Sequence, residues 1–315
     1  MRVLALTAGL VLGLGVPAIA QAPVATAPVA APVPELMELG YDRHQRPTTA
    51  VTIGDAGPYD FLVDTGAQAT VLSRELADAL ALFDRQPVTL VGMASRVATH
   101  TVAITDLGIG QRRTDVPRAV LVDGQHIGGA DGVLGLDALQ GQRVLFDFAR
   151  RTMTVAPAGE ARSSRGYEIV VRARARSGQL IITDARVEGI RTAIVIDTGA
   201  QVSIGNAALA RQLRARQSAE MELNDINGAV AYGQIHVASR AEIGRLNLAS
   251  VPIVFASSPA FHALDLEQRP AMFLGMRELR LLRRIAIDFG SRRILFDVPS
   301  SEREMAEAWA RLTEP

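Results

Sequence analysis

Apolar residues in this chain occur mostly in short runs of β-type residues separated by turns. Runs of roughly four to eight such residues, bounded by Gly, Pro, Asn or Asp, are typical of β-strands. The clearest runs cover residues 48–53, 59–63, 116–122, 144–148, 152–155, 251–255, 285–289 and 293–298. The pattern therefore predicts a mostly β protein.

Only short helices are expected between these strands. Ser73 and Asn206 are typical N-cap residues, and the residues after them have helical spacing as far as about Leu82 and Arg214. Residues 299–315 predict a C-terminal helix, because Ser301-x-x-Glu304 is a capping box. The apolar residues of this helix recur at helical spacing, and we expect them to pack on the body of the protein.

Two further patterns concern strands. Residues 88–104 and 221–237 contain Gly between β-formers and predict hairpins, the second with Asn227-Gly228 at its turn. Arg172, Arg174 and Arg176 alternate with alanine. A period of two predicts one strand with a solvated or edge face.

The sequence Asp-Thr-Gly-Ala-Gln occurs twice, at residues 64–68 and 197–201. Each copy follows an apolar run, at residues 61–63 and 194–196. A strand that ends on a carboxylate and turns at Gly presents that carboxylate at a loop tip. Two such tips could face each other.

The rest of the chain repeats with these motifs. Asp64 and Asp197 are 133 residues apart, and four later dipeptides recur at offsets of 134, 135, 140 and 141. The recurring dipeptides are Ile109-Gly110 and Ile243-Gly244, Val116-Pro117 and Val251-Pro252, Leu134-Gly135 and Leu274-Gly275, and Asp147-Phe148 and Asp288-Phe289. An offset that grows by small steps indicates a tandem duplication with a few loop insertions.

Two Asp-Thr-Gly-Ala copies, each with a Thr or Ser three residues after the Ala and a later Leu-Gly step, resemble the retropepsin-like aspartic peptidases, bacterial secreted type. The resemblance covers about residues 48–298. It implies an all-β, two-lobed acid protease (retropepsin/pepsin-like) fold with short helices. We place the lobes at residues 48–155 and 167–298, joined by a linker at 156–166.

The resemblance also implies roles for individual residues. Asp64 and Asp197 would be the catalytic pair, since two carboxyls that share one proton supply both a base and an acid. Loop support would come from Thr65, Gly66, Thr198, Gly199, Leu134, Gly135, Leu274 and Gly275. Substrate binding would involve Ala67, Gln68, Ala200, Gln201, Gly92 and Tyr232, the last two in flaps near residues 92–98 and 224–232. An exposed Tyr232 without a role is an equal alternative.

The chain departs from the viral pattern at two places in each repeat. Gln68 and Gln201 stand where an acidic residue follows the Ala, and Leu136 and Met276 replace the Arg after the supporting Gly. The Arg–carboxylate brace is therefore missing, and we expect the loops to be supported in another way.

The N-terminal segment predicts export. Residues 1–22 combine Arg2, a short apolar run and an Ala-x-Ala site, as in a cleavable signal peptide. The run is short for a bilayer span, so we expect no stable membrane insertion after cleavage and a periplasmic or secreted location. Residues 23–47, rich in Pro and Ala at their start, predict a tether or pro-segment.

Composition narrows the chemistry further. The chain has no Cys, which excludes thiol catalysis and thiolate metal sites, and its five His residues show no ligand spacing. We expect no metal and no cofactor. No Ser lies in a Gly-x-Ser-x-Gly motif, and a net charge of zero gives no reason to expect a nucleic-acid partner.

The sequence therefore predicts an exported aspartic endopeptidase that acts on peptide or protein substrates. Because both Asp-Thr-Gly copies lie in one chain, we expect a monomer. The main alternative is a non-catalytic peptide-binding protein on the same fold, and a structural envelope protein is a third reading supported only by the tether.

Overall fold

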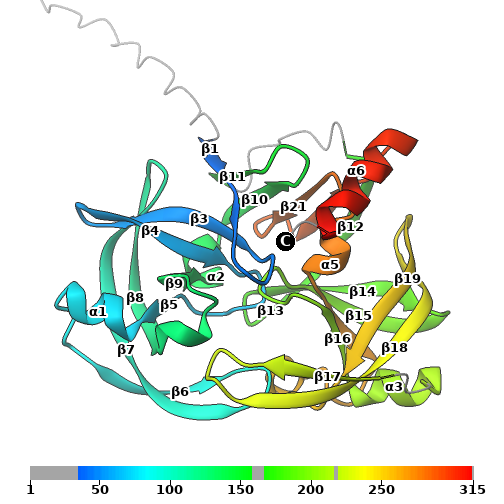
Figure 1. Cartoon of the computed structure of the whole chain (residues 1–315), viewed down its shortest axis with the longest axis horizontal. Helices are drawn as coiled ribbons and strands as arrows, with labels where there is room; N and C mark the ends of the chain where they lie inside the picture. The colour runs from blue at the N-terminus through cyan, green and yellow to red at the C-terminus, as the bar shows by residue number, and fades with distance from the viewer. Residues whose placement is uncertain (1–34, 158–166, 216–218, 314–315) are drawn as a thin grey trace, which may run out of the picture. The chain divides into compact units, whose positions relative to one another are not determined.

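The computed structural model describes residues 35–157, 167–215 and 219–313, which belong to one compact unit (Figure 1). The predicted signal peptide, the predicted tether as far as residue 34, and the predicted linker from residue 158 to 166 lie outside the described residues.

The first repeat forms an eight-stranded sheet. Its strands, in spatial order, are β2 (Gly40–Tyr41), β3 (Pro47–Ile53), β4 (Ala56–Val63), β9 (Gly132–Leu134), β5 (Val71–Ser73), β8 (Arg112–Val122), β7 (Arg96–Ile109) and β6 (Gln86–Val91). All neighbours pair antiparallel except β4 with β9 and β5 with β8, which are parallel. The parallel pair β4 and β9 is the one that leads into the first Asp-Thr-Gly loop.

The second repeat forms an eight-stranded sheet of the same design. Its spatial order is β13 (Arg174–Arg176), β14 (Gln179–Val187), β15 (Ile190–Ile196), β20 (Ala271–Leu274), β16 (Ser203–Gly205), β19 (Leu246–Phe255), β18 (Val230–Ile243) and β17 (Ala219–Asn224). Every strand has its counterpart at the same place in the first sheet. The predicted all-β, two-lobed fold built from a tandem duplication is confirmed.

A third sheet has six strands, which come from both repeats. Its order is β1 (Glu35–Glu38), β11 (Thr152–Pro157), β10 (Gln142–Asp147), β21 (Arg284–Asp288), β22 (Arg293–Asp297) and β12 (Ile169–Arg172). At its centre β10 and β21 pair antiparallel, with Val144 opposite Ile287 and Phe146 opposite Ile285. Each repeat thus supplies half of a sheet that joins the two lobes through main-chain hydrogen bonds.

Two expectations about chain segments need correction. Residues 35–47 were expected in the tether, but β1 and β2 lie there and Leu39 between them is buried. The arginines at 172, 174 and 176 were expected on one strand, but the chain leaves the six-stranded sheet at Ala173 and enters the second lobe's sheet. An alternation with a period of two indicates a strand, but it does not identify the sheet to which that strand belongs.

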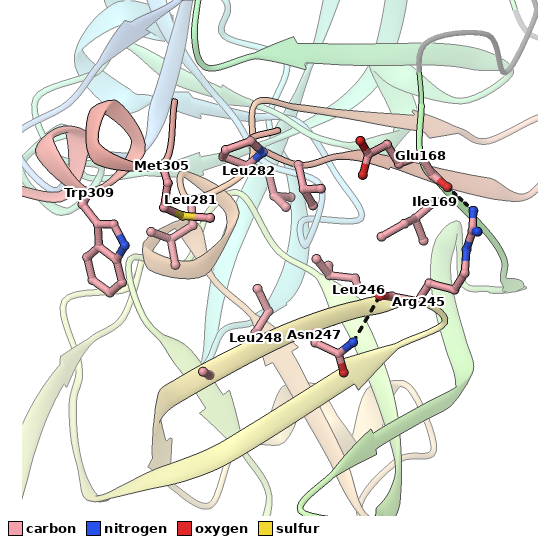
Figure 2. A pocket seen from close by; sticks show the side chains of 13 residues that line it. Glu168, Ile169, Arg245, Leu246, Asn247, Leu248, Leu281, Leu282, Met305 and Trp309 are labelled. Atoms are coloured by element: carbon pink, nitrogen blue, oxygen red, sulfur yellow. Dashed lines mark hydrogen bonds between the residues drawn. The ribbon is translucent and has the colours of Figure 1, made fainter. Parts of the chain in front are cut away.

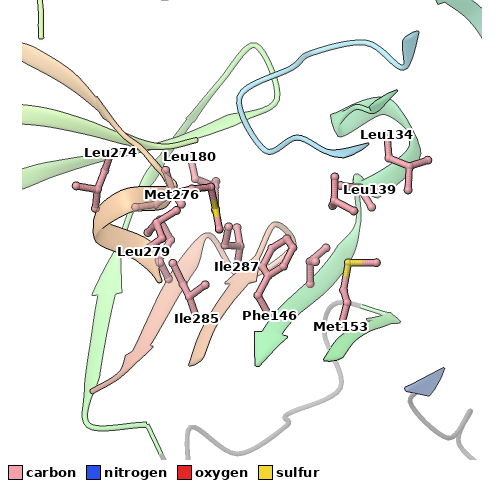
Figure 3. Packing of buried hydrophobic residues seen from close by; sticks show 14 of the residues in the cluster. Leu134, Leu139, Phe146, Met153, Leu180, Leu274, Met276, Leu279, Ile285 and Ile287 are labelled. Atoms are coloured by element: carbon pink, nitrogen blue, oxygen red, sulfur yellow. The ribbon is translucent and has the colours of Figure 1, made fainter. Parts of the chain in front are cut away.

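Buried side chains from both repeats meet above the six-stranded sheet. Figure 3 shows Leu134 and Leu139 of the first repeat on one side and Met276 and Leu279 of the second on the other, with Phe146 of β10 between them. All five side chains are at most 1% exposed. One continuous apolar core therefore lies beneath both Asp-Thr-Gly loops.

The helices are short, as expected. They are α1 (Arg74–Ala79), the 3-10 helix at Gly124–His126, α2 (Leu136–Leu139), α3 (Ala207–Leu213), α4 (Pro259–Ala263) and α5 (Met276–Leu279). Ser73 and Asn206 are the N-caps of α1 and α3: their side chains accept hydrogen bonds from Leu76 N (3.1 Å) and Leu209 N (2.9 Å). No helix in the described ranges is long and apolar enough to cross a membrane.

Helix α6 (Glu302–Thr313) begins with the predicted cap, in which Ser301 Oγ accepts a hydrogen bond from Glu304 N at 3.2 Å. The helix buries Ala308 completely, but the expectation that its apolar residues pack on the body is wrong for Met305 and Trp309, which are 42% and 53% exposed. These two side chains border a cavity of about 760 Å³ between α6 and β19 (Figure 2). The residues that line this cavity include neither aspartate of the repeated motif.

Candidate active site

Both copies of the Asp-Thr-Gly sequence form loops at the ends of equivalent strands. Asp64 follows β4 and Asp197 follows β15. The N–H of Asp64 donates to the carbonyl of Leu134 (3.1 Å), and the N–H of Asp197 donates to that of Leu274 (3.0 Å). The two Leu-Gly steps thus lie directly beside the strands that carry the aspartates.

Each carboxylate is fixed by its own loop. Oδ1 of Asp64 accepts hydrogen bonds from Gly66 N (2.7 Å) and Ala67 N (3.0 Å). Oδ1 of Asp197 is held in the same way by the N–H groups two and three residues after it, at 2.9 and 3.1 Å. Two N–H donors on one oxygen stabilise the ionised form and fix the direction of the carboxylate.

The two loops face each other at very short range. A Cβ atom placed on Gly66 would lie 2.6 Å from Cγ of Asp197, and one on Gly199 would lie even closer to Cγ of Asp64. No side chain fits at either position, so only glycine allows the two carboxyls to approach. The duplication therefore brings one aspartate from each repeat into a single site.

Burial and mutual contact change the acidity of the pair. Burial and the charge of Asp64 raise the pKa of Asp197 well above its usual value. The pKa of Asp64 is also raised by burial, although a hydrogen bond from Gly66 and the charge of Arg46 oppose this rise. Because two like charges in contact are unfavourable, the pair holds one proton and titrates as a unit. Such a pair contains a base and an acid side by side.

The two threonines of the motifs link the loops to each other. Thr65 N donates to Oγ1 of Thr198 (3.0 Å), and Thr198 N donates to Oγ1 of Thr65 (3.2 Å). Each hydroxyl in turn donates to a carbonyl of the opposite repeat, from Thr65 to Ile196 (2.8 Å) and from Thr198 to Val63 (2.5 Å). Both side chains are buried, so these four hydrogen bonds are shielded from water.

In the first repeat, a hydrogen bond between a hydroxyl group and a carboxylate takes the place of the missing Arg–carboxylate brace. Thr70 Oγ1 donates to Asp137 (2.7 Å) and accepts from Gly135 N (3.3 Å), which ties the end of the active loop to the Leu-Gly step. Gly135 has no room for a side chain, because a Cβ would overlap the backbone of Ala69.

The second repeat has a buried version of this support. Ser203 Oγ accepts from Gly275 N (3.1 Å) and donates to Glu278, which is 3% exposed. Burial raises the pKa of Glu278 to about 7. The repeated motif marks Thr70 and Ser203 but not Asp137 and Glu278, because these stand two and three residues after the supporting Gly rather than at one matching position.

Glu278 makes stability depend on pH. Its folded pKa of about 7 exceeds the usual 4.5, so the folded state keeps a proton that the unfolded state releases between these values. We expect its contribution to the free energy of unfolding to fall by about 3 kcal/mol as pH rises from 4.5 to 7.5. Urea unfolding of wild type and Glu278→Gln at pH 4.5, 6 and 7.5 measures this, and the variant should lose less stability over this range. The exposed Glu302→Gln is the control, and equal pH dependence of wild type and Glu278→Gln would contradict the expectation.

Both predicted hairpins are present, and we call their turn segments the flap tips. Strands β6 and β7 meet at residues 92–95, and β17 and β18 meet at residues 225–229, with Gly228 in the left-handed region of the second turn. The tips are bonded to each other through Asp225, which is 4% exposed. Its carboxylate accepts hydrogen bonds from Met93 N (3.2 Å), Ala94 N (3.1 Å) and Ser95 Oγ (2.7 Å).

Each flap tip also packs against the opposite lobe. Met93 of the first flap contacts the apolar cluster of the second lobe around Phe261 and Phe273. Ile226 of the second flap contacts the cluster of the first lobe around Val71 and Val133. In this structure the two flap tips are therefore joined to each other through the hydrogen bonds of Asp225.

The remaining predicted site residues are those expected to bind substrate. Ala67 O and Ala200 O accept hydrogen bonds from the N–H groups of residues 136 and 276. Gln68 and Gln201 are exposed. Gly92 lies against Asp225 at the flap tips, whereas Tyr232 is 63% exposed on β18 opposite Glu222.

Among the described residues, no three or more His, Asp or Glu side chains are grouped so that they could hold a metal ion.

The two matching halves are also recognised by sequence comparison. A family model described as aspartyl protease matches residues 49–138 and, separately, residues 183–277. The first match contains Asp64 and the Leu-Gly step at 134–135, and the second contains Asp197 and the step at 274–275. Comparison with curated protein sequences finds no match.

Proposed function

The chain belongs to the aspartyl protease family, and from this premise we propose that it is an endopeptidase that cleaves peptide bonds with a water molecule activated between Asp64 and Asp197. One observation carries the proposal: two carboxyls, one from each repeat, are held in contact by two glycines that leave no room for a side chain.

The proposed reaction uses the single proton of the pair. The ionised carboxylate takes a proton from water while the water oxygen attacks the peptide carbonyl carbon, and the protonated carboxyl gives its proton to the carbonyl oxygen. The resulting diol then loses a hydroxyl proton to one carboxylate as the nitrogen takes a proton from the other carboxyl. The C–N bond breaks, and the pair returns to its starting state.

We propose that the substrate is an extended peptide bound beneath the flaps. The backbone at Ala67, Gln68, Ala200 and Gln201 flanks the carboxyl pair, and Gly92 lies at a flap tip. Binding requires the contacts of Asp225 to break, since these join the tips. Tyr232 is a further candidate contact on the arm of the second flap.

The test is incubation of the purified protein with a diverse peptide library across pH 3 to 8, with and without a statine-type inhibitor. We expect internal cleavage that the inhibitor blocks, and a bell-shaped pH profile centred on the acid side, because the reactive form carries one proton. Peptides that are retained but not cleaved would favour a peptide-binding protein. Alkaline activity that resists the inhibitor and is lost with a chelator would point to a metal enzyme.

Export is a separate proposal that rests on the pattern of residues 1–22 alone. We expect the signal to be cleaved after Ala20 or Ala22 and the protein to be periplasmic or secreted. Cell fractionation with mass analysis of the N-terminus tests this. An intact Met1 in the cytoplasmic fraction would contradict it.

We expect a functional monomer, since both aspartates lie in one chain and β10 and β21 join the repeats in one sheet. A covalent link keeps the partner lobe at an effective concentration near millimolar, far above working enzyme concentrations. Activity per molecule should therefore stay constant from micromolar to low nanomolar, with a mass of one chain by light scattering. Activity that falls on dilution while a dimer dissociates would mean that the loops pair between chains.

A further inference from the structure

At one pair of equivalent positions the two repeats carry different residues, and each residue contacts the Asp-Thr-Gly loop of the opposite repeat. Arg46 and Gln179 are 133 residues apart, the same spacing as Asp64 and Asp197. Arg46 Nη1 donates to the carbonyl of Gly199 (3.4 Å), and Gln179 Nε2 donates to that of Gly66. Each side chain thus reaches the loop of the opposite repeat, and one is a cation where the other is a neutral amide.

Arg46 is held firmly at this place. Its Nε and Nη2 donate to Oδ2 of Asp42 at 2.9 and 2.7 Å, and its backbone N donates to Oδ1 at 2.8 Å. The Asp42 side chain is 2% exposed and that of Arg46 is 19% exposed. Because Asp42 neutralises part of the charge of Arg46, we expect the guanidinium to change the pKa of a neighbouring carboxyl by only a moderate amount.

The loop that Arg46 contacts is the one packed against Asp64. A Cβ on Gly199 would overlap the carboxyl of Asp64, so the guanidinium lies on that side of the pair. The charged groups that act on Asp64 are Arg46 and Asp197. Asp42 pairs with Arg46, and nearby His44 has a pKa lowered by burial and by the same guanidinium.

We propose that Arg46 breaks the symmetry of the pair, so that Asp64 is the ionised base and Asp197 carries the shared proton. These chemical roles rest on the proposed peptidase function. In the first step Asp64 takes the proton from water and Asp197 gives its proton to the carbonyl oxygen. In the second step Asp64 gives its proton to the leaving nitrogen and Asp197 regains one from the diol. Arg46 is thus a positioning residue that acts through Asp64.

Burial and the charge of Asp64 raise the pKa of Asp197 well above its usual value, whereas for Asp64 burial raises the pKa and both the hydrogen bond from Gly66 and the charge of Arg46 oppose that rise. Both agree with the geometry. At the equivalent place beside the other loop, Gln179 carries no charge that would favour ionisation of Asp197.

The decisive test reads each carboxyl separately and needs no activity. With Asp carboxyl carbons labelled by ¹³C, the remaining aspartate is titrated by NMR in an Asp197→Asn and in an Asp64→Asn background. The signal of that aspartate is identified as the one that disappears when both Asp64 and Asp197 are replaced by Asn. We expect Arg46→Gln to raise the pKa of Asp64 by about one unit in the first background and to move Asp197 much less in the second. Arg46→Lys, which keeps the charge, should restore most of the difference.

Gln179→Arg is a second variant that leaves the Asp42 contact intact. It should lower the pKa of Asp197 in the Asp64→Asn background by about one unit. In the enzyme with both aspartates, Arg46→Gln should move the acid limb of kcat/KM upward by about half a unit or more. Equal shifts at the two carboxyls, or no shift at either, would overturn the inference. Absence of any peptide cleavage would instead overturn the proposed function, and the NMR titrations would still test the effect of Arg46 on the two carboxyls.

Discussion

Replacing either Asp64 or Asp197 by Asn is expected to lower kcat/KM for peptide cleavage by about 1000-fold or more. One carboxyl cannot act as base and acid in the same step, and each of these contributions is typically worth about 100- to 10,000-fold. The carboxyls lie in contact across Gly66 and Gly199, so an amide at either position has almost the same shape and loses only the proton chemistry.

The two variants should remain folded. Burial raises the pKa of both aspartates, which means that the charged pair is a cost to the folded state at neutral pH. An Asn removes part of that cost, so the melting temperature should stay the same or rise. Asp55→Asn, in the exposed turn before β4, is the matched control and should keep full activity. Substantial turnover in either active-site variant would mean that another group supplies the acid or the base.

Much of this site was predictable because it depends on local sequence that is repeated. A strand that ends on Asp, followed by Gly at a close approach, was recognised twice, and the recurring Leu-Gly steps marked the strands that lie beside it. The helix caps at Ser73 and Asn206 were also predicted, because a cap depends only on the residues next to it.

Features that depend on long-range pairing were missed. The alternating arginines after residue 171 predicted a strand, but nothing in the alternation marks the change of sheet at Ala173. Residues 35–47 were assigned to a tether because Pro and Ala dominate the residues before them, although β1 completes the edge of the shared sheet. Pairing partners more than 100 residues away, such as Glu35 and Val155, leave no local pattern.

Side-chain contacts within the site were the hardest to predict. Asp225 and Glu278 read as ordinary surface acids in the sequence, yet both are at least 96% buried and each binds a hydroxyl group. Arg46 lies 18 residues before Asp64, and no local pattern marks its contact with the opposite loop, which corresponds to that of Gln179 in the other repeat.

Thr198→Val is expected to lower the free energy of unfolding by about 2 to 5 kcal/mol. Valine keeps the shape of the side chain, but it leaves Thr65 N and the carbonyl of Val63 buried without their hydrogen bonds to the hydroxyl. An unsatisfied buried polar group costs about 1 to 3 kcal/mol, and here two are created at once. Because these bonds connect the repeats, the loss should also loosen the alignment of the two carboxyls and reduce kcat at least tenfold.

Thr198→Ser is the matched control, because it removes only a methyl group and keeps the hydroxyl that both partners use. Its unfolding free energy should stay within about 1.5 kcal/mol of wild type, and its kcat within a few fold. Thr183→Val, at a partly buried strand position outside the loops, controls for the substitution itself. The measurements are urea unfolding at pH 5 and peptide turnover on the same preparations. If Thr198→Val and Thr198→Ser lose stability equally, the contribution of this residue is packing, and the hydroxyl network does not hold the two loops together.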